Sequence, residues 1–151
     1  MRKYELTNET KTLADGTVLH RIRALRDIPR HGVKAGDLGG LIEKENNLSQ
    51  DGDAWISDDA CVSGDARISG DARIFGDSDY MVIKNTWSSG RWFTYTRSNK
   101  KWAVGCFYGT GEELVAKAYK DSELSGRCYE AIVRAVETIE AAKAEAKGGA
   151  K

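Results

Sequence analysis

A run of six-residue repeats limits the possible folds of this chain more than any other feature. From Gly52 the sequence reads GDAWIS, DDACVS, GDARIS, GDARIF and GDSDYM, in one unbroken phase. Each block carries a small residue at its third position and, with one aromatic exception, an aliphatic residue at its fifth. Side chains two residues apart on an extended segment point to the same side. These two positions therefore predict an interior, and successive repeats are expected to stack.

The Gly-Asp pair between blocks predicts a turn, because Gly adopts positive φ and Asp caps its own turn. Three sides then close one coil, so residues 18 apart should stack, with Ile56 on Ile74 and Trp55 on Arg73. We therefore expect residues 48–79 to form a short left-handed parallel β-helix. The pairing of Trp55 with Arg73 predicts a cation–π contact on its surface. For the repeated aspartates, turn capping is favoured over a calcium site or a mimic of DNA.

A longer segment that contains the repeat resembles a known family. Residues 33–74 read VKAGDLGGLIEKENNLSQDGDAWISDDACVSGDARISGDARI, and they resemble the YdcK-like hexapeptide-repeat proteins of bacteria and their phages. Those proteins share VKAGxxGG-[WL]-[IV] and then NLSQ-x-GD-x-W-[IV]; Leu41 stands here where the family usually has Trp. The resemblance implies a hexapeptide-repeat fold and a phage or prophage product.

Residues outside the repeat predict an α+β fold in three parts. Residues 1–47 should form a β-hairpin, with its turn at Asp15-Gly16, and a loop that caps the first coil. Residues 80–151 should form a small antiparallel sheet with two helices. The strand-like runs are 80–87, 91–97 and 102–109.

Two sequence signals mark the helices. Thr110 and Glu113 form a capping box that should open a helix over 111–120. From Tyr129 to Ile139, apolar residues recur at helical spacing and predict a second helix with one buried stripe. We expect this stripe to pack on the strands, although a partner helix is an alternative.

The sequence offers little for catalysis or for metal binding. Hexapeptide acyltransferases use a His as general base, but His20 and His31 both lie outside the repeat. Three cysteines, at positions 61, 106 and 128, lack the spacing of a zinc site. We therefore predict a protein that is not an enzyme and holds no metal or cofactor, with a reduced acyltransferase as an alternative.

Charge is distributed unevenly along the chain. Residues 1–36 hold eight Lys/Arg and four Asp/Glu, residues 37–79 hold three and eleven, and residues 80–151 hold twelve and eight. An acidic middle between basic ends could attract other copies, and a small core is marginal alone. We predict a dimer or trimer, with part of the contact at the outward residues Trp55, Cys61 and Phe75.

No apolar run is long enough to span a membrane, and the first residues lack the apolar core of a signal peptide. We therefore expect a cytoplasmic protein without membrane contact, located in the host cytoplasm if a phage encodes it.

Basic and aromatic side chains alternate near the third part of the chain, and they suggest a binding surface. The candidates there are Arg91, Tyr95, Arg97, Lys100 and Lys101, joined by Trp55, Arg73 and Phe75 from the repeat. Such strands stack bases and pair with phosphates, but the same aromatics would also suit a core.

The leading hypothesis is a non-catalytic phage-type binding protein, for which the role of a host-defence antagonist is considered. It would occupy a host protein or sequester a small nucleotide-like ligand. A nucleotide or nucleic-acid binder that uses the strand at 91–102 is the alternative.

Overall fold

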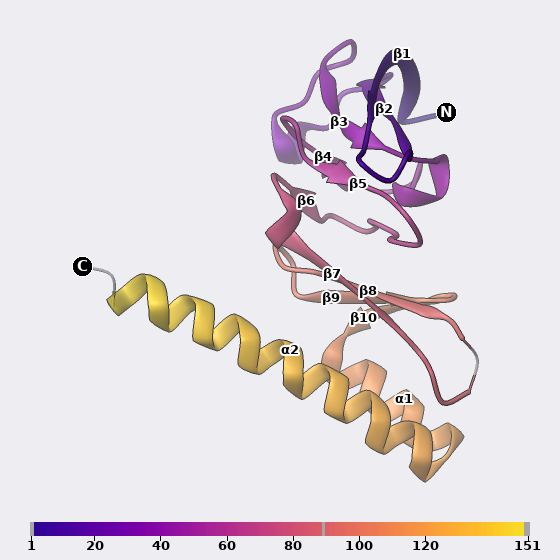
Figure 1. The fold of residues 1–151 in the computed structure, drawn as a ribbon, viewed down its shortest axis with the longest axis vertical. Coiled ribbons are helices and arrows are strands. Elements are labelled where there is room, and N and C mark those ends of the chain that lie inside the picture. Colours follow the sequence, from indigo (N-terminus) through magenta and orange to yellow (C-terminus); the bar gives the residue numbers. More distant parts are fainter. Residues whose placement is uncertain (1, 89, 150–151) are drawn as a thin grey trace. The chain divides into compact units, whose positions relative to one another are not determined.

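The computed structural model describes residues 2–88 and 90–149, which form an α+β structure of two compact units, Met1–Tyr108 and Gly109–Lys151 (Figure 1). The first unit holds β1 (Tyr4–Thr12), β2 (Val18–Ala24), β3 (Leu38–Ile42), β4 (Trp55–Ile56), β5 (Cys61–Val62), β6 (Arg73–Ile74), β7 (Tyr80–Lys84), β8 (Trp92–Thr96) and β9 (Lys101–Val104). Short 3-10 turns cover Pro29–His31, Glu45–Asn47 and Asp77–Asp79. Strand β10 (Phe107–Thr110) leads into α1 (Gly111–Asp121) and α2 (Glu123–Gly149).

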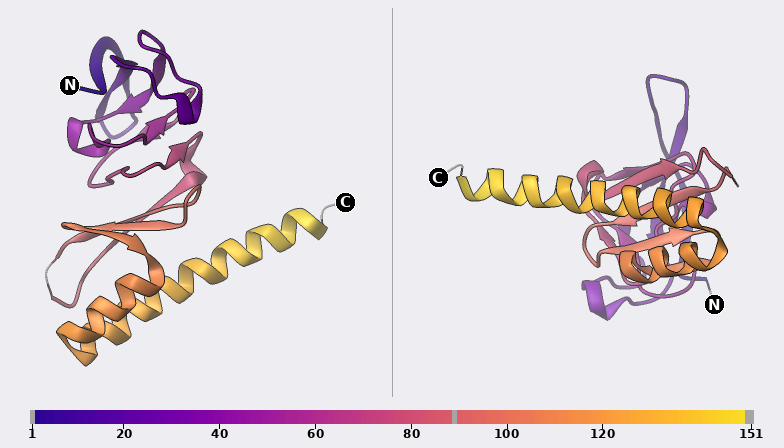
Figure 2. Two further views of the ribbon diagram at one scale, coloured as in Figure 1. Left: turned by 180° about the vertical axis from the view of Figure 1, so that it is seen from behind. Right: turned by 90° about the horizontal axis from the view of Figure 1, so that it is seen from below.

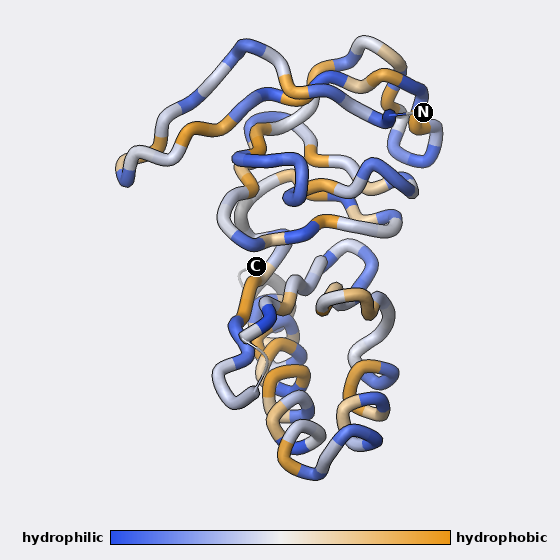
Figure 3. Tube along the Cα trace, turned by 90° about the vertical axis from the view of Figure 1, so that its right-hand side faces the viewer, coloured by the Kyte–Doolittle hydropathy of each residue, from blue (hydrophilic) through white to orange (hydrophobic). Residues whose placement is uncertain are grey.

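The predicted N-terminal hairpin is confirmed. β1 and β2 pair antiparallel, and the turn between them places Gly16 at a φ of 91° while the Asp15 carboxylate accepts a hydrogen bond from the Thr17 N–H. The turn end of the hairpin extends away from the repeat (Figure 3). β2 also pairs antiparallel with β3, and β3 pairs in parallel with β5. The hairpin and the repeat therefore share one sheet, in the order β1-β2-β3-β5.

The alternation of inward and outward residues in the repeat is confirmed. In the first four blocks the predicted inward residues are all buried: Ala54, Ile56, Ala60, Val62, Ala66, Ile68, Ala72 and Ile74. In the fifth block the pattern fails, because Ser78 is exposed and Tyr80 is half-buried. Between β4 and β6 the register is the predicted one, with Trp55 beside Arg73 and Ile56 beside Ile74. Every second side chain of an extended segment points to the same side. Because these side chains are apolar here, the segment folds around a single apolar interior.

The prediction of a left-handed parallel β-helix is nevertheless wrong. β4, β5 and β6 contain only two residues each. Within residues 2–88 and 90–149, parallel pairing is limited to β3–β5, β4–β6 and an isolated bridge between Leu48 and Ile68. The pairs β1–β2, β2–β3, β7–β8 and β8–β9 are antiparallel. The sheets are therefore mostly antiparallel, and no extended parallel β-helix forms.

Side chains from β8 and the following turn end the parallel stacking. The Arg67 N–H donates to Thr94 Oγ1 at 2.9 Å, and the Arg73 N–H donates to Ser98 Oγ at 2.8 Å. A buried backbone N–H needs an acceptor, and another coil would supply a carbonyl here. The hydroxyl oxygens of Thr94 and Ser98 accept these hydrogen bonds in place of the carbonyls of another coil. At the other end of the stack, β2 pairs with the edge of β3 that β5 leaves open. Both ends of the stack are therefore closed to further coils.

The C-terminal strands form a separate sheet in the order β10-β9-β8-β7. The run 102–109, expected to be one strand, is divided into β9 and β10 at Gly105, whose φ is 56°. Tyr95 and Trp102 lie in ring contact, with centroids 5.0 Å apart, and both are buried. Their burial shows that aromatic residues of this sheet serve as core.

The capping box predicted for the first helix is confirmed. Glu113 N–H donates to Thr110 Oγ1 at 3.2 Å, and Thr110 N–H donates to the Glu113 carboxylate at 2.9 Å. α2 begins earlier than expected, and Gly126 lets it approach α1, since a Cβ there would lie 2.2 Å from the Tyr119 ring. α2 has 27 residues and α1 has 11, so α2 extends well beyond α1 (Figure 2).

Lys3 is an unexpected charged residue in the interior. Its side chain has no exposed surface, and Nζ donates to the Ala54 carbonyl at 2.7 Å. Burial, together with the charge of the nearby Arg26, lowers the pKa of Lys3 to about 8. Burial disfavours the charged form of an amine, so the ammonium destabilises the folded state at neutral pH.

We expect stability to increase when the pH is raised from 7 to 9. The pKa of Lys3 is lowered in the folded state from its ordinary value of 10.5, so the unfolded chain binds more protons than the folded chain between about pH 8 and pH 10.5. The free energy of unfolding should therefore rise by about 1 kcal/mol between pH 7 and pH 9. Urea unfolding at both pH values measures the change. Lys3→Met, which cannot titrate, should lose this increase; an equal increase in the variant would assign it to another group.

Candidate functional site

Trp55 lies inside the protein and not on its surface, so its prediction as an outward contact residue is wrong. Its side chain is only 2% exposed. The indole lies against Gly39, where an added Cβ would be 2.6 Å from its Cζ2 atom. Trp55 does point away from the repeat interior, but β3 covers it. It is therefore unavailable for a partner or for a contact between copies.

Arg73 makes a different cation–π contact from the one predicted. Its guanidinium lies 4.7 Å from the ring centroid of Phe75, its neighbour on the same side of the chain. It also donates to the His31 carbonyl at 2.7 Å and to Ser57 Oγ at 3.1 Å. Phe75 is 54% exposed. Arg73 is therefore held in place by the protein itself, and Phe75 remains accessible.

The candidate residues around β8 are not gathered on one exposed surface. Tyr95 is 6% exposed, and Arg97 lies 3.9 Å from the Asp79 carboxylate. Arg91 and Lys100 are exposed, and Lys101 is half-buried at the start of β9. The structure thus presents basic side chains here without an exposed Tyr95 ring on which a base could stack.

The repeated aspartates are joined to basic residues of the N-terminal segment. Arg30 reaches both Asp53 (3.3 Å) and Asp71 (3.5 Å), which are one coil apart. Likewise Asp59 pairs with Arg21 at 3.0 Å. In residues 2–88 and 90–149, no group of His, Cys, Asp and Glu side chains has the arrangement of a metal site.

The two histidines are separated within the first unit. His31 Nε2 lies 3.1 Å from the Asp71 carbonyl, and burial and the charge of Arg73 lower its pKa. His20 lies on β2, opposite Thr10 and Ile42. The structure therefore does not bring them to one place.

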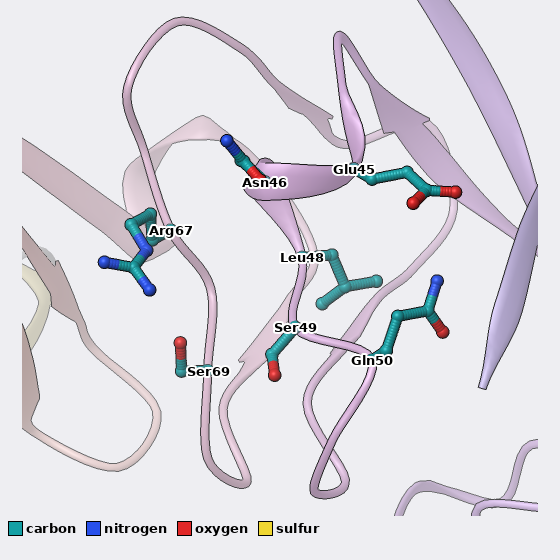
Figure 4. A pocket seen from close by; sticks show the side chains of 7 residues that line it. All are labelled: Glu45, Asn46, Leu48, Ser49, Gln50, Arg67 and Ser69. Atoms are coloured by element: carbon teal, nitrogen blue, oxygen red, sulfur yellow. The ribbon is translucent and has the colours of Figure 1, made fainter. Parts of the chain in front are cut away.

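A polar pocket of about 420 Å³ lies on the outer side of the repeat (Figure 4). It is lined by Glu45, Asn46, Leu48, Ser49, Gln50, Arg67 and Ser69. Its volume is within the range of small-ligand sites, about 300–1,000 Å³. No sequence pattern predicted this pocket.

The backbone explains how these residues meet. Leu48 and Ile68 form a parallel bridge, and the Ser49 N–H donates to the Ile68 carbonyl at 2.9 Å. Arg67 and Ser69 flank the inward Ile68, so both point outward beside Ser49. The only sequence signal was the outward position of Arg and Ser in the repeat; the proximity of residues 45–50 required the fold.

Several side chains in the pocket already form hydrogen bonds or ion pairs with other residues of the protein. Gln50 Oε1 accepts hydrogen bonds from the Lys3 and Tyr4 N–H groups, and Gln50 Nε2 donates to the Tyr4 carbonyl. The Glu45 carboxylate pairs with the Arg2 guanidinium. These groups shape one end of the pocket and have little remaining capacity for a ligand.

The other side of the pocket offers hydrogen-bond donors. Arg67 is exposed and uses Nη1 to donate to the Gly105 carbonyl at 2.9 Å. Within the described chain it has no carboxylate partner, and neither the Ser69 hydroxyl nor the Asn46 amide has a hydrogen bond. Ser49 Oγ accepts from the Asp51 N–H at 3.1 Å, which leaves its proton available. The arrangement can bind a ligand through several convergent donors.

A second depression lies between the two helices of the C-terminal unit. It has a volume of about 210 Å³, with Val115, Ala116 and Val133 among its lining residues. Glu112, Glu130, Arg134 and Glu137 also line it, and Arg134 pairs with Glu130 and Glu137. It is smaller and more apolar than the pocket in the repeat.

Comparison with known proteins adds no family. No family model matches the chain, and no curated protein matches it significantly. In the part of the chain that the structure describes, neither helix has the length and apolar character needed to cross a membrane.

Proposed function

We propose that this chain is a non-catalytic binding protein that sequesters a small polar ligand in the pocket formed by residues 45–50 and 67–69. The observation that carries the proposal is the set of unused donors at Arg67, Ser69, Ser49 and Asn46 within one pocket of about 420 Å³. Binding sites combine a concave surface with a few convergent polar groups.

The wider biological setting is also a proposal. The resemblance of residues 33–74 to YdcK-like proteins supports a phage or prophage product that acts in the host cytoplasm. A ligand-sequestering protein without catalytic chemistry would fit an antagonist of a host defence that signals through a small molecule. Self-association as a dimer or trimer remains part of the proposal, with Phe75 as an accessible apolar contact residue.

Closing the pocket should abolish ligand capture. We expect the wild-type protein, mixed with a small-molecule extract of bacterial cells and desalted, to retain at least one compound that mass spectrometry detects after denaturation. Ser69→Trp should lose this compound, because the indole would fill the space beside Arg67 and Ser49. Ser69 Oγ makes no hydrogen bond to any residue that the structure describes, so the fold should persist.

Ser63→Trp is the matched control, since Ser63 also holds an outward position in the repeat but does not line the pocket. Its retention of the compound should equal that of the wild type. If wild-type protein retains nothing, or if both tryptophan variants retain the compound equally, the pocket is not the binding site.

A further inference from the structure

We infer that the ligand of this pocket carries an oxyanion, a phosphate ester being the class that fits best, and that Arg67 binds it. This inference rests on the proposed function and names the chemistry of its ligand. It depends on the balance between donors and acceptors in the pocket.

Arg67 differs from most arginines of the chain. Arg21, Arg23, Arg26, Arg30, Arg97 and Arg134 each lie within 4 Å of a carboxylate. Arg67 has only the Gly105 carbonyl as partner, through Nη1, in the described residues. Its Nε and Nη2 groups remain available, and a guanidinium presents such N–H pairs in the geometry that suits phosphate and carboxylate.

The remaining free groups near Arg67 reinforce this preference. The hydroxyl protons of Ser49 and Ser69 are available for donation, and Figure 4 shows the Ser69 hydroxyl and the Arg67 side chain on the same side of Leu48. The carboxylate in the pocket, that of Glu45, is neutralised by Arg2. The free donors therefore outnumber the free acceptors, and the side that contains Arg67 has a positive charge without compensation.

A ligand rich in acceptors satisfies such a site, whereas a donor-rich or cationic ligand does not. A phosphate monoester offers three acceptor oxygens and close to two negative charges at neutral pH. The pocket is larger than a phosphate group alone, so the remainder of the ligand would lie over Leu48, toward Gln50. Because the Gln50 amide already bonds the backbone of Lys3 and Tyr4, its side chain would form a wall of the pocket without hydrogen-bonding the ligand.

The test uses three probes: inorganic phosphate, ribose 5-phosphate and ribose. In isothermal titration we expect ribose 5-phosphate to bind more tightly than inorganic phosphate, and ribose not to bind at about 10 mM. Arg67→Gln should weaken the binding of ribose 5-phosphate at least about tenfold, as expected for loss of hydrogen bonds from a charged group. Arg127→Gln removes an exposed arginine of α2 outside the pocket and should leave the affinity unchanged.

The outcomes separate this inference from the proposed function. Equal binding of ribose and ribose 5-phosphate, with no effect of Arg67→Gln, would overturn the oxyanion assignment while a pocket-dependent ligand remained. Absence of binding by all three probes would also overturn it, and the cell-extract experiment with Ser69→Trp would still decide whether the pocket binds anything. Melting curves of both glutamine variants exclude a loss of folding as the cause.

Discussion

Replacement of Ile68 by aspartate will abolish folding of the first unit. Ile68 has no exposed surface and belongs to the main apolar cluster. The substitution removes about 1.5–3 kcal/mol of apolar burial and places an unpaired carboxylate in the interior, where a charge costs several kcal/mol more. Domains of this size are stable by only about 5–15 kcal/mol. Circular dichroism and urea unfolding should show no cooperative transition for Ile68→Asp.

Arg67→Asp is the control for this result, since it introduces the same charge at the adjacent, exposed position. It removes a hydrogen bond to the Gly105 carbonyl but leaves the backbone bond to Thr94 in place. We expect a cooperative transition within about 1 kcal/mol of the wild type. Equal stability of the two variants would show that the inward and outward assignment is incorrect.

The second large effect is expected at Gly40, where β3 approaches the repeat. A Cβ at this position would lie 2.4 Å from Ile56 Cγ2 and 2.6 Å from the Ala60 carbonyl oxygen. One of these contacts is with backbone, which cannot rotate away as a side chain can. Gly40→Val should therefore lower the free energy of unfolding by about 3 kcal/mol or more, because overpacking forces the backbone to move.

Gly76→Val provides a matched comparison. Gly76 has an extended backbone with a φ of −167°, and a Cβ there would meet no atom within 4 Å. Its effect on the thermal midpoint should be within about 3 °C, while Gly40→Val should lower the midpoint by about 8 °C or more. Similar midpoints for the two variants would mean that β3 is not packed closely against the repeat.

The uneven charge of the chain has a structural role within the first unit. Basic residues of the N-terminal segment pair with aspartates of the repeat, as Arg30 does with Asp53 and Asp71, and as Lys44 does with Asp65 at 3.9 Å. Exposed pairs of this kind stabilise by only about 0–1 kcal/mol each. Their main consequence is that much of the acidic surface of the repeat is already matched by its own chain.

The side-chain amides of Asn47 and Gln50, in the NLSQ segment, have structural roles that only the three-dimensional structure reveals. Asn47 Oδ1 accepts hydrogen bonds from the Glu43 and Lys44 N–H groups, and its Nδ2 donates to the Gly64 and Ala66 carbonyls. Gln50 holds the backbone of β1 in the same manner. Both side chains therefore replace backbone partners, and the serine between them is left to line the pocket.

In its first four blocks, the repeat by itself determined which residues face the apolar interior. Alternation with a period of two predicts Ala66 and Ile68 inward from local geometry alone, and the spacing of 18 residues predicted the pairing of Ile56 with Ile74. The capping box at Thr110 was equally local, because its two hydrogen bonds join residues only three positions apart. These features need no knowledge of the rest of the chain.

Tertiary structure decided what surrounds the repeat. No local pattern indicates that β3 covers Trp55, that Thr94 and Ser98 supply acceptors at the last coil, or that Glu45 and Arg67 line one pocket. The parallel stacking ends because distant hydroxyl groups satisfy its N–H donors, and the candidate site exists because a bridge between Leu48 and Ile68 joins segments 20 residues apart. Contacts of this range depend on the packing of the whole unit, which a pattern of neighbouring residues does not contain.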